Sequence, residues 1–140
     1  MKLQLIGFTP RLEEVLATAV LTTTAGSTPS KVFSRVSGDS KRVESLIEGL
    51  QLQHGSVLEH NRIDWLLEAS DKEAFNLLLR SKFFNLTRLE EGLWLLSANL
   101  RTIVEYVTAE DGPMRDALFD SMKEFAPTIL RCLEAKIREG

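Results

Sequence analysis

Apolar and polar side chains alternate in two short stretches of the chain, which is the period of a β-strand. Near the beginning, Leu3 and Leu5 alternate with Lys2, Gln4 and Ile6, and residues 2–7 are predicted to form a first strand. In residues 62–68, the apolar side chains of Ile63, Trp65 and Leu67 recur at every second position. This second stretch is therefore predicted to be a strand with one buried face.

Two further strands are predicted on either side of a short connection. Residues 83–89 and 93–97 flank Glu90-Glu91-Gly92. The glycine supplies the left-handed residue that a three-residue hairpin needs, so the pattern predicts a β-hairpin. One continuous helix over residues 71–107 remains the alternative, because Leu, Glu and Arg are good helix formers.

Helical spacing of apolar residues dominates the rest of the first half. Residues 12–20 follow Thr9, predicted as the N-cap, and Pro10, predicted at the first helical position. Residues 22–37 are rich in Thr, Ser, Gly and Pro, which predicts a long loop. The next helix has Asp39 or Ser40 as its predicted N-cap, and its apolar stripe consists of Val43, Leu46, Ile47 and Leu50.

A helix after the second strand begins at a recognisable capping box. Ser70 is the predicted N-cap, and Glu73 stands three residues later as the other half of the box. The apolar side chains of Phe75, Leu78 and Leu79 are expected to face the core.

Two helical segments follow the hairpin. The first covers residues 99–107 and ends before the turn Asp111-Gly112-Pro113. The last covers residues 114–138 with an interruption at Pro127, because proline cannot donate the hydrogen bond that a helix interior requires. Its inward side chains are predicted to be Leu118, Met122, Phe125, Ile129 and Leu133.

The order of these elements mixes hairpin and helical connections, which predicts the α+β class with a largely antiparallel sheet flanked by helices. Residues 1–140 are long enough for a single domain with its own core. The net charge of -3 argues against a nucleic-acid partner, and the absence of a long apolar run argues against a membrane span. One cysteine, Cys132, and no signal-peptide pattern predict a cytoplasmic protein. Cys132 lies on the apolar side of its helical pattern, so it is interpreted as a buried structural thiol.

Both histidines of the chain lie in one segment, His54-Gly55-Ser56-Val57-Leu58-Glu59-His60. Histidine is the side chain most easily used for proton or ligand chemistry near neutral pH. The segment resembles the signature loop of the flavin-dependent thymidylate synthases, and this resemblance implies that His60 contacts flavin. A metal site made of His54, Glu59 and His60 would lack the i, i+4 helical pairing and any third ligand cluster nearby, so no metal site is predicted.

A second block, Ser97-Ala98-Asn99-Leu100-Arg101-Thr102, resembles the Asn-Ala-Arg-Ser segment of the same family. The resemblance assigns flavin contacts to Asn99 and Arg101. An amide suits the edge of a heterocycle, and a guanidinium suits a phosphate or a flat ring. The alternatives are that Asn99 caps a helix, that Arg101 is a surface charge and that both histidines are structural.

The third block departs from the family pattern. The family motif Arg-His-Arg, seven residues and Ser falls on Arg80-Ser81-Lys82 and Glu90, so Arg80 and Lys82 are the candidate substrate-binding residues. Lys82 lacks the two-pronged guanidinium, and Glu90 would repel a nucleotide phosphate. Glu110 stands where the family has an arginine for the pyrimidine. The helical insertion of the family is replaced by the turn at residues 90–92.

The resemblance implies FAD as cofactor, NADPH as reductant, a nucleotide ligand and a homotetramer or other homo-oligomer. The substituted positions predict that normal methylation of dUMP is lost, and no catalytic residue is assigned. Two hypotheses follow: a thymidylate synthase-like protein that retains FAD or nucleotide binding, or a non-catalytic oligomeric binding or assembly module on the same fold. A chance resemblance would leave an unrelated small α+β domain.

Overall fold

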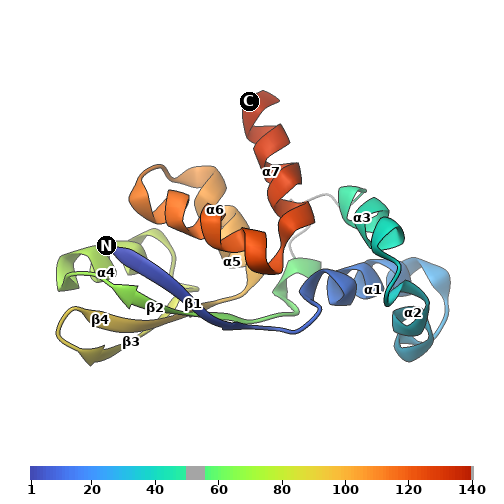
Figure 1. The fold of residues 1–140 in the computed structure, drawn as a ribbon, viewed down its shortest axis with the longest axis horizontal. Coiled ribbons are helices and arrows are strands. Elements are labelled where there is room, and N and C mark those ends of the chain that lie inside the picture. Colours follow the sequence, from blue (N-terminus) through green and yellow to red (C-terminus); the bar gives the residue numbers. More distant parts are fainter. Residues whose placement is uncertain (50–55, 140) are drawn as a thin grey trace.

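A four-stranded antiparallel sheet forms one side of the protein in the computed structural model, which describes residues 1–49 and 56–139. The spatial order of the strands is β1-β2-β4-β3 (Figure 1). Their bounds are Lys2–Phe8 for β1, Ile63–Glu68 for β2, Asn85–Glu90 for β3 and Leu93–Ala98 for β4. The predicted hairpin is confirmed as β3 and β4, and the α+β class is confirmed with it. The predicted three-residue connection is wrong, because Glu90 pairs with Leu93 and only Glu91 and Gly92 join the strands.

Helices account for most of the other residues that the structure describes. Their bounds are Leu12–Ala25 for α1, Pro29–Val36 for α2, Ser40–Glu48 for α3, Asp71–Arg80 for α4, Leu100–Ala109 for α5, Pro113–Phe125 for α6 and Pro127–Glu139 for α7. Figure 1 shows α5 and α6 over one face of the sheet, with α1, α2 and α3 grouped at the other end of the long axis. Pro127 separates α6 from α7, as predicted.

The core lies between the sheet and the helices. Ile63, Trp65 and Leu67 are buried on one face of β2, which confirms the predicted alternation. Trp65 also donates a hydrogen bond from its indole Nε1 to Ser121 Oγ on α6, at 2.8 Å. All five inward side chains predicted for the last two helices are buried. The buried apolar residues form a cluster that extends from α1 to α7.

The predicted start of α1 is wrong. Thr9 continues the pairing of β1 with the segment before β2: its backbone N–H donates to Arg62 O at 2.9 Å, and its Oγ1 accepts from Arg62 N at 2.8 Å. Helix α1 begins at Leu12, and its N-cap is Arg11, in the left-handed region at φ 56°. The Thr9 hydroxyl therefore extends the pairing of β1 and does not cap α1.

The predicted loop over residues 22–37 is also wrong. Helix α1 continues to Ala25, and α2 follows with Pro29 in its first turn. Val32 and Val36 of α2 are buried, and α2 packs against α1. This packing outweighs the weak helix propensity of the Ser- and Thr-rich sequence.

The capping box of α4 is confirmed, since Ser70 Oγ accepts from Glu73 N and Glu73 Oε1 accepts from Ser70 N. The predicted core face of α4 is wrong at two positions. Phe75 is 55% exposed and Leu79 is 84% exposed, whereas Ala74 and Leu77 are buried.

The other predicted N-cap, Asp39, is confirmed on α3, where its Oδ1 accepts from Arg42 N at 3.1 Å. Within residues 1–49 and 56–139, no helix is both long and apolar enough to cross a membrane.

Candidate functional site

The described part of the histidine segment contains a single turn of 3-10 helix. His54 and Gly55 lie outside the described residues, so their predicted roles stay predictions. The turn covers Val57–Glu59, and buried Leu58 anchors it to the core. His60 ends the turn, with its backbone N–H 3.5 Å from Val57 O, and the residue is exposed. The ring is therefore accessible to solvent.

The segment after His60 is tied to the N-terminus of α5. Asn61 Oδ1 accepts a hydrogen bond from Leu100 N at 2.7 Å. The two blocks that carry the family resemblance, about forty residues apart in sequence, therefore lie side by side. Bringing a loop and a helix N-terminus together is the arrangement in which binding sites are commonly built.

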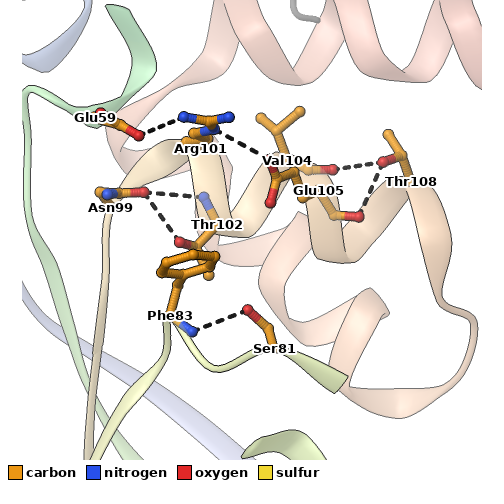
Figure 2. Close-up of polar contacts among 9 residues, drawn as sticks. All are labelled: Glu59, Ser81, Phe83, Asn99, Arg101, Thr102, Val104, Glu105 and Thr108. Atoms are coloured by element: carbon orange, nitrogen blue, oxygen red, sulfur yellow. Dashed lines mark hydrogen bonds and ion pairs between the residues drawn. The ribbon is translucent and has the colours of Figure 1, made fainter. Parts of the chain in front are cut away.

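Asn99 is the N-cap of α5. Its Oδ1 accepts from Thr102 N at 3.0 Å and from Thr102 Oγ1 at 3.1 Å (Figure 2). The capping alternative for Asn99 is therefore confirmed, and its side-chain oxygen is engaged within the chain.

Arg101 is held by two carboxylates of the same chain. Its Nη1 lies 2.5 Å from Glu59 Oε1, and its Nε lies 3.1 Å from Glu105 Oε1 (Figure 2). The hydrogen bond that Arg101 donates to Glu59, followed by the one that it donates to Glu105, raises the pKa of Arg101 above its usual value. One cation between two carboxylates leaves this cluster with a net negative charge, which disfavours an anionic ligand.

A small cleft lies beside these residues. Its volume is about 110 Å³, and its lining consists of Glu59, Phe83, Asn99, Arg101, Thr102 and Glu105. Phe83 is 58% exposed, and Figure 2 shows its ring next to the first turn of α5. Pockets for cofactors and drug-sized ligands measure roughly 300–1,000 Å³. The cleft and its engaged polar groups do not fit a flavin within one chain.

The candidate substrate-binding residues lie at the end of α4. Arg80 Nη1 is 3.8 Å from Oε1 of Glu110, the C-cap residue of α5. An anion bound by Arg80 would therefore be repelled by the Glu110 carboxylate. Lys82 is exposed, with its Nζ 5.3 Å from the centre of the Phe83 ring. Tyr106 lies near this pair: burial, followed by the Glu110 charge, raises the pKa of its phenol.

Glu59 and Glu105, the two carboxylates on Arg101, were not among the residues that the sequence singled out for binding. The Arg101–Glu105 pair is spaced by four positions on α5, a pattern that sequence inspection could have found. Contact of Arg101 with Glu59 spans forty-two positions and has no local signal.

The remaining candidates for site chemistry are metal ligands and the cysteine. Among residues 1–49 and 56–139, no three His, Cys, Asp or Glu side chains are grouped so that they could hold a metal ion. Cys132 is half-buried on α7, less buried than the sequence predicted, and this burial raises the pKa of its thiol. A raised thiol pKa reduces the fraction of reactive thiolate, which fits a structural role.

No protein-family model matches the chain, and no curated protein matches it.

Proposed function

We propose that this protein is a diverged relative of the flavin-dependent thymidylate synthases that acts as a non-catalytic, oligomeric binding or assembly module. The observation that carries the proposal is the pairing of Arg101 with Glu59 and Glu105. The arginine that the resemblance assigns to flavin already has anionic partners within its own chain. A ligand phosphate would have to displace them and approach two negative charges.

The relationship to the family is supported by the convergence of its two best-matched blocks. Glu59 and Asn61 flank His60, and they contact Arg101 and Leu100 at the start of α5. A chance resemblance in two separate segments would not require them to meet in space.

The assembly role is supported by apolar side chains on the surface. Phe75 and Leu79 project from α4, and Phe83 follows that helix at 58% exposure. Exposed apolar groups that lie close together mark interaction surfaces more often than isolated ones do.

Retained FAD or nucleotide binding is the second candidate, and the exposed Phe83 ring at the cleft favours it. A second chain packed there could enlarge the site and present His60, Asn99 and Arg101 to the ligand. In that case FAD would supply the redox chemistry and NADPH the reducing equivalents, while this chain would bind and orient the flavin. The substitutions at Lys82 and Glu90 argue against dUMP methylation in both candidates.

A titration of the purified full chain with FAD separates the two candidates, with flavin fluorescence as the readout. The wild type is expected to give no saturable change. The Glu59→Gln/Glu105→Gln variant removes the two negative charges that contact Arg101. If either protein gains FAD binding, this variant is expected to be the one. Saturable binding by the wild type, weakened by His60→Ala and by Arg101→Ala, would reject the non-catalytic proposal in favour of the flavin-binding one.

A cytoplasmic location belongs to the same proposal. The chain contains one cysteine, and free thiols persist in reducing compartments.

A further inference from the structure

The outward face of α4 has an apolar centre. Leu79 is 84% exposed and Phe75 is 55% exposed, and the polar residues Lys72 and Asn76 are exposed beside them. On a helix with 3.6 residues per turn, these four side chains lie within an arc of about 100°. Burial of this arc would remove a leucine and much of a phenylalanine from water, which is favourable.

An open hollow of about 830 Å³ lies on this face. Its lining consists of Lys72, Glu73, Phe75, Asn76 and Leu79. The Phe75 ring stands edge-on to Trp94, with their centroids 6.1 Å apart, so one wall of the hollow is fixed by the sheet. The same face therefore carries a projecting leucine and a hollow beside it.

We propose that α4 binds α4 of a second copy of this chain in antiparallel orientation, with Leu79 of each copy inserted into the hollow of the other. The inference rests on the proposed assembly function and identifies the surface and the partner. A contact that uses the same patch on both copies closes as a two-fold dimer.

The charges along α4 select the antiparallel orientation. Its first turn carries Asp71 and Glu73, and its last turn carries Arg80. If Glu73 lies opposite Arg80 of the second copy, Leu79 falls at the level of residue 74, between Lys72, Phe75 and Asn76. Two equivalent Glu73–Arg80 pairs form by symmetry, and the two helix dipoles oppose each other favourably.

Both charged groups remain available for these pairs. Glu73 uses Oε1 for the capping box, and its second carboxylate oxygen can accept further hydrogen bonds. Arg80 lies 3.8 Å from Glu110, and its side chain is 55% exposed. A guanidinium has five N–H donors, so Arg80 can contact both carboxylates.

The ten residues of α4 offer a small contact area. Interfaces below about 1,200 Å² of total buried surface are characteristic of weak or transient complexes. The proposal therefore predicts a monomer–dimer equilibrium that depends on protein concentration.

Sedimentation velocity of the full chain over a wide concentration range measures this equilibrium. The wild type is expected to shift from monomer to dimer as its concentration rises. Leu79→Asp places a charge in the contact and is expected to weaken dimerisation by about tenfold or more. Because Leu79 is largely exposed, the fold is expected to persist, which circular dichroism checks. Leu89→Asp, at an exposed leucine of β3, is the matched control and is expected to dimerise like the wild type.

A cysteine at Asn76 tests the predicted orientation. Residue 76 lies close to the two-fold axis, so Asn76→Cys is expected to form a 76–76 disulfide under mild oxidation, identified by mass spectrometry. Ser45→Cys, exposed on α3, is expected to form none. A wild type that stays monomeric would overturn both this inference and the assembly function. An oligomer that survives Leu79→Asp, or that gives no 76–76 disulfide, would overturn the α4 contact alone.

Discussion

A carboxylate of α1 holds the first turn of α7. Glu13 Oε2 accepts hydrogen bonds from the backbone N–H groups of Thr128 and Ile129, at 3.0 and 3.1 Å. Helix α7 begins at Pro127, and its first turn depends on this distant acceptor, whereas α4 has its local capping box. The box at Ser70 and Glu73 was predictable because both partners lie three positions apart. Glu13 acts across more than a hundred positions, and no sequence pattern indicates its role.

The first prediction concerns the hydrogen bonds of Glu13. Glu13→Ala leaves two backbone N–H groups of α7 without this acceptor, and we expect it to reduce the free energy of unfolding by about 1–3 kcal/mol. Glu13→Gln keeps an acceptor oxygen and is expected to lose much less. Urea unfolding at pH 7 measures both variants. Equal losses in the two variants would show that the charge, rather than the acceptor, holds α7.

The second prediction concerns pH. Burial raises the pKa of Glu13, outweighing the hydrogen bonds that lower it. The folded state therefore binds a proton more tightly than the unfolded state, and the contribution of this group to stability rises as pH falls through the folded pKa. It levels off below the unfolded pKa. The free energy of unfolding of the wild type, relative to that of Glu13→Gln, is thus expected to increase as the pH falls from 7 to 4. A difference that stays constant over this range would contradict the assigned shift.

At the scale of elements, local signals predicted the strands and misjudged two helical regions. The β3–β4 hairpin was predictable because Gly92, at φ 77°, provides the left-handed residue that the turn requires. Helix α2 was missed because buried Val32 and Val36 stabilise it through packing against α1, which propensity does not register. On α4 the apolar pattern itself was misleading, since Phe75 and Leu79 face outward and the smaller Ala74 faces the core.

The third prediction tests the hairpin turn. Gly92→Ala forces a residue with a Cβ into the left-handed region, and we expect a loss of about 1–2 kcal/mol in the free energy of unfolding. Gly7→Ala is the matched control, because Gly7 lies in β1 with an ordinary φ and open space for a Cβ. The control is expected to be neutral or slightly stabilising. Thermal unfolding measures the stability of both variants, and an equal change in the two would reject the special role of Gly92.

At the scale of the whole molecule, the α+β class followed from the order of elements, but the arrangement did not. Strand β1 lies at one edge of the sheet and pairs with β2, some sixty positions later. The candidate site shows the same division. Sequence predicted that Asn99 caps α5 or binds a ligand, and the capping role follows from local chemistry. The ion pair between Arg101 and Glu59 joins two segments that are distant in sequence, so it could be found only from the fold.

The last prediction concerns cooperativity. Helix α7 packs against α3, α5 and α6, and its buried residues belong to the same cluster as Trp65 and Trp94 of the sheet. A shared core implies that sheet and helices unfold together, so far-UV circular dichroism and tryptophan fluorescence are expected to give coincident urea transitions. Leu133→Ala creates a cavity under α7, remote in sequence from both tryptophans.

A loss of about 2–5 kcal/mol is expected from Leu133→Ala, and it should move both transitions by the same amount. Ile137→Ala on the same helix is the control, because Ile137 is exposed and its truncation removes little burial. If α7 instead unfolds separately, the circular dichroism transition of Leu133→Ala will precede the fluorescence transition. Coincident shifts in both signals would mean that the sheet, the cleft at α5 and the outward face of α4 belong to one cooperative unit. A cavity under α7 would then destabilise all three by the same amount.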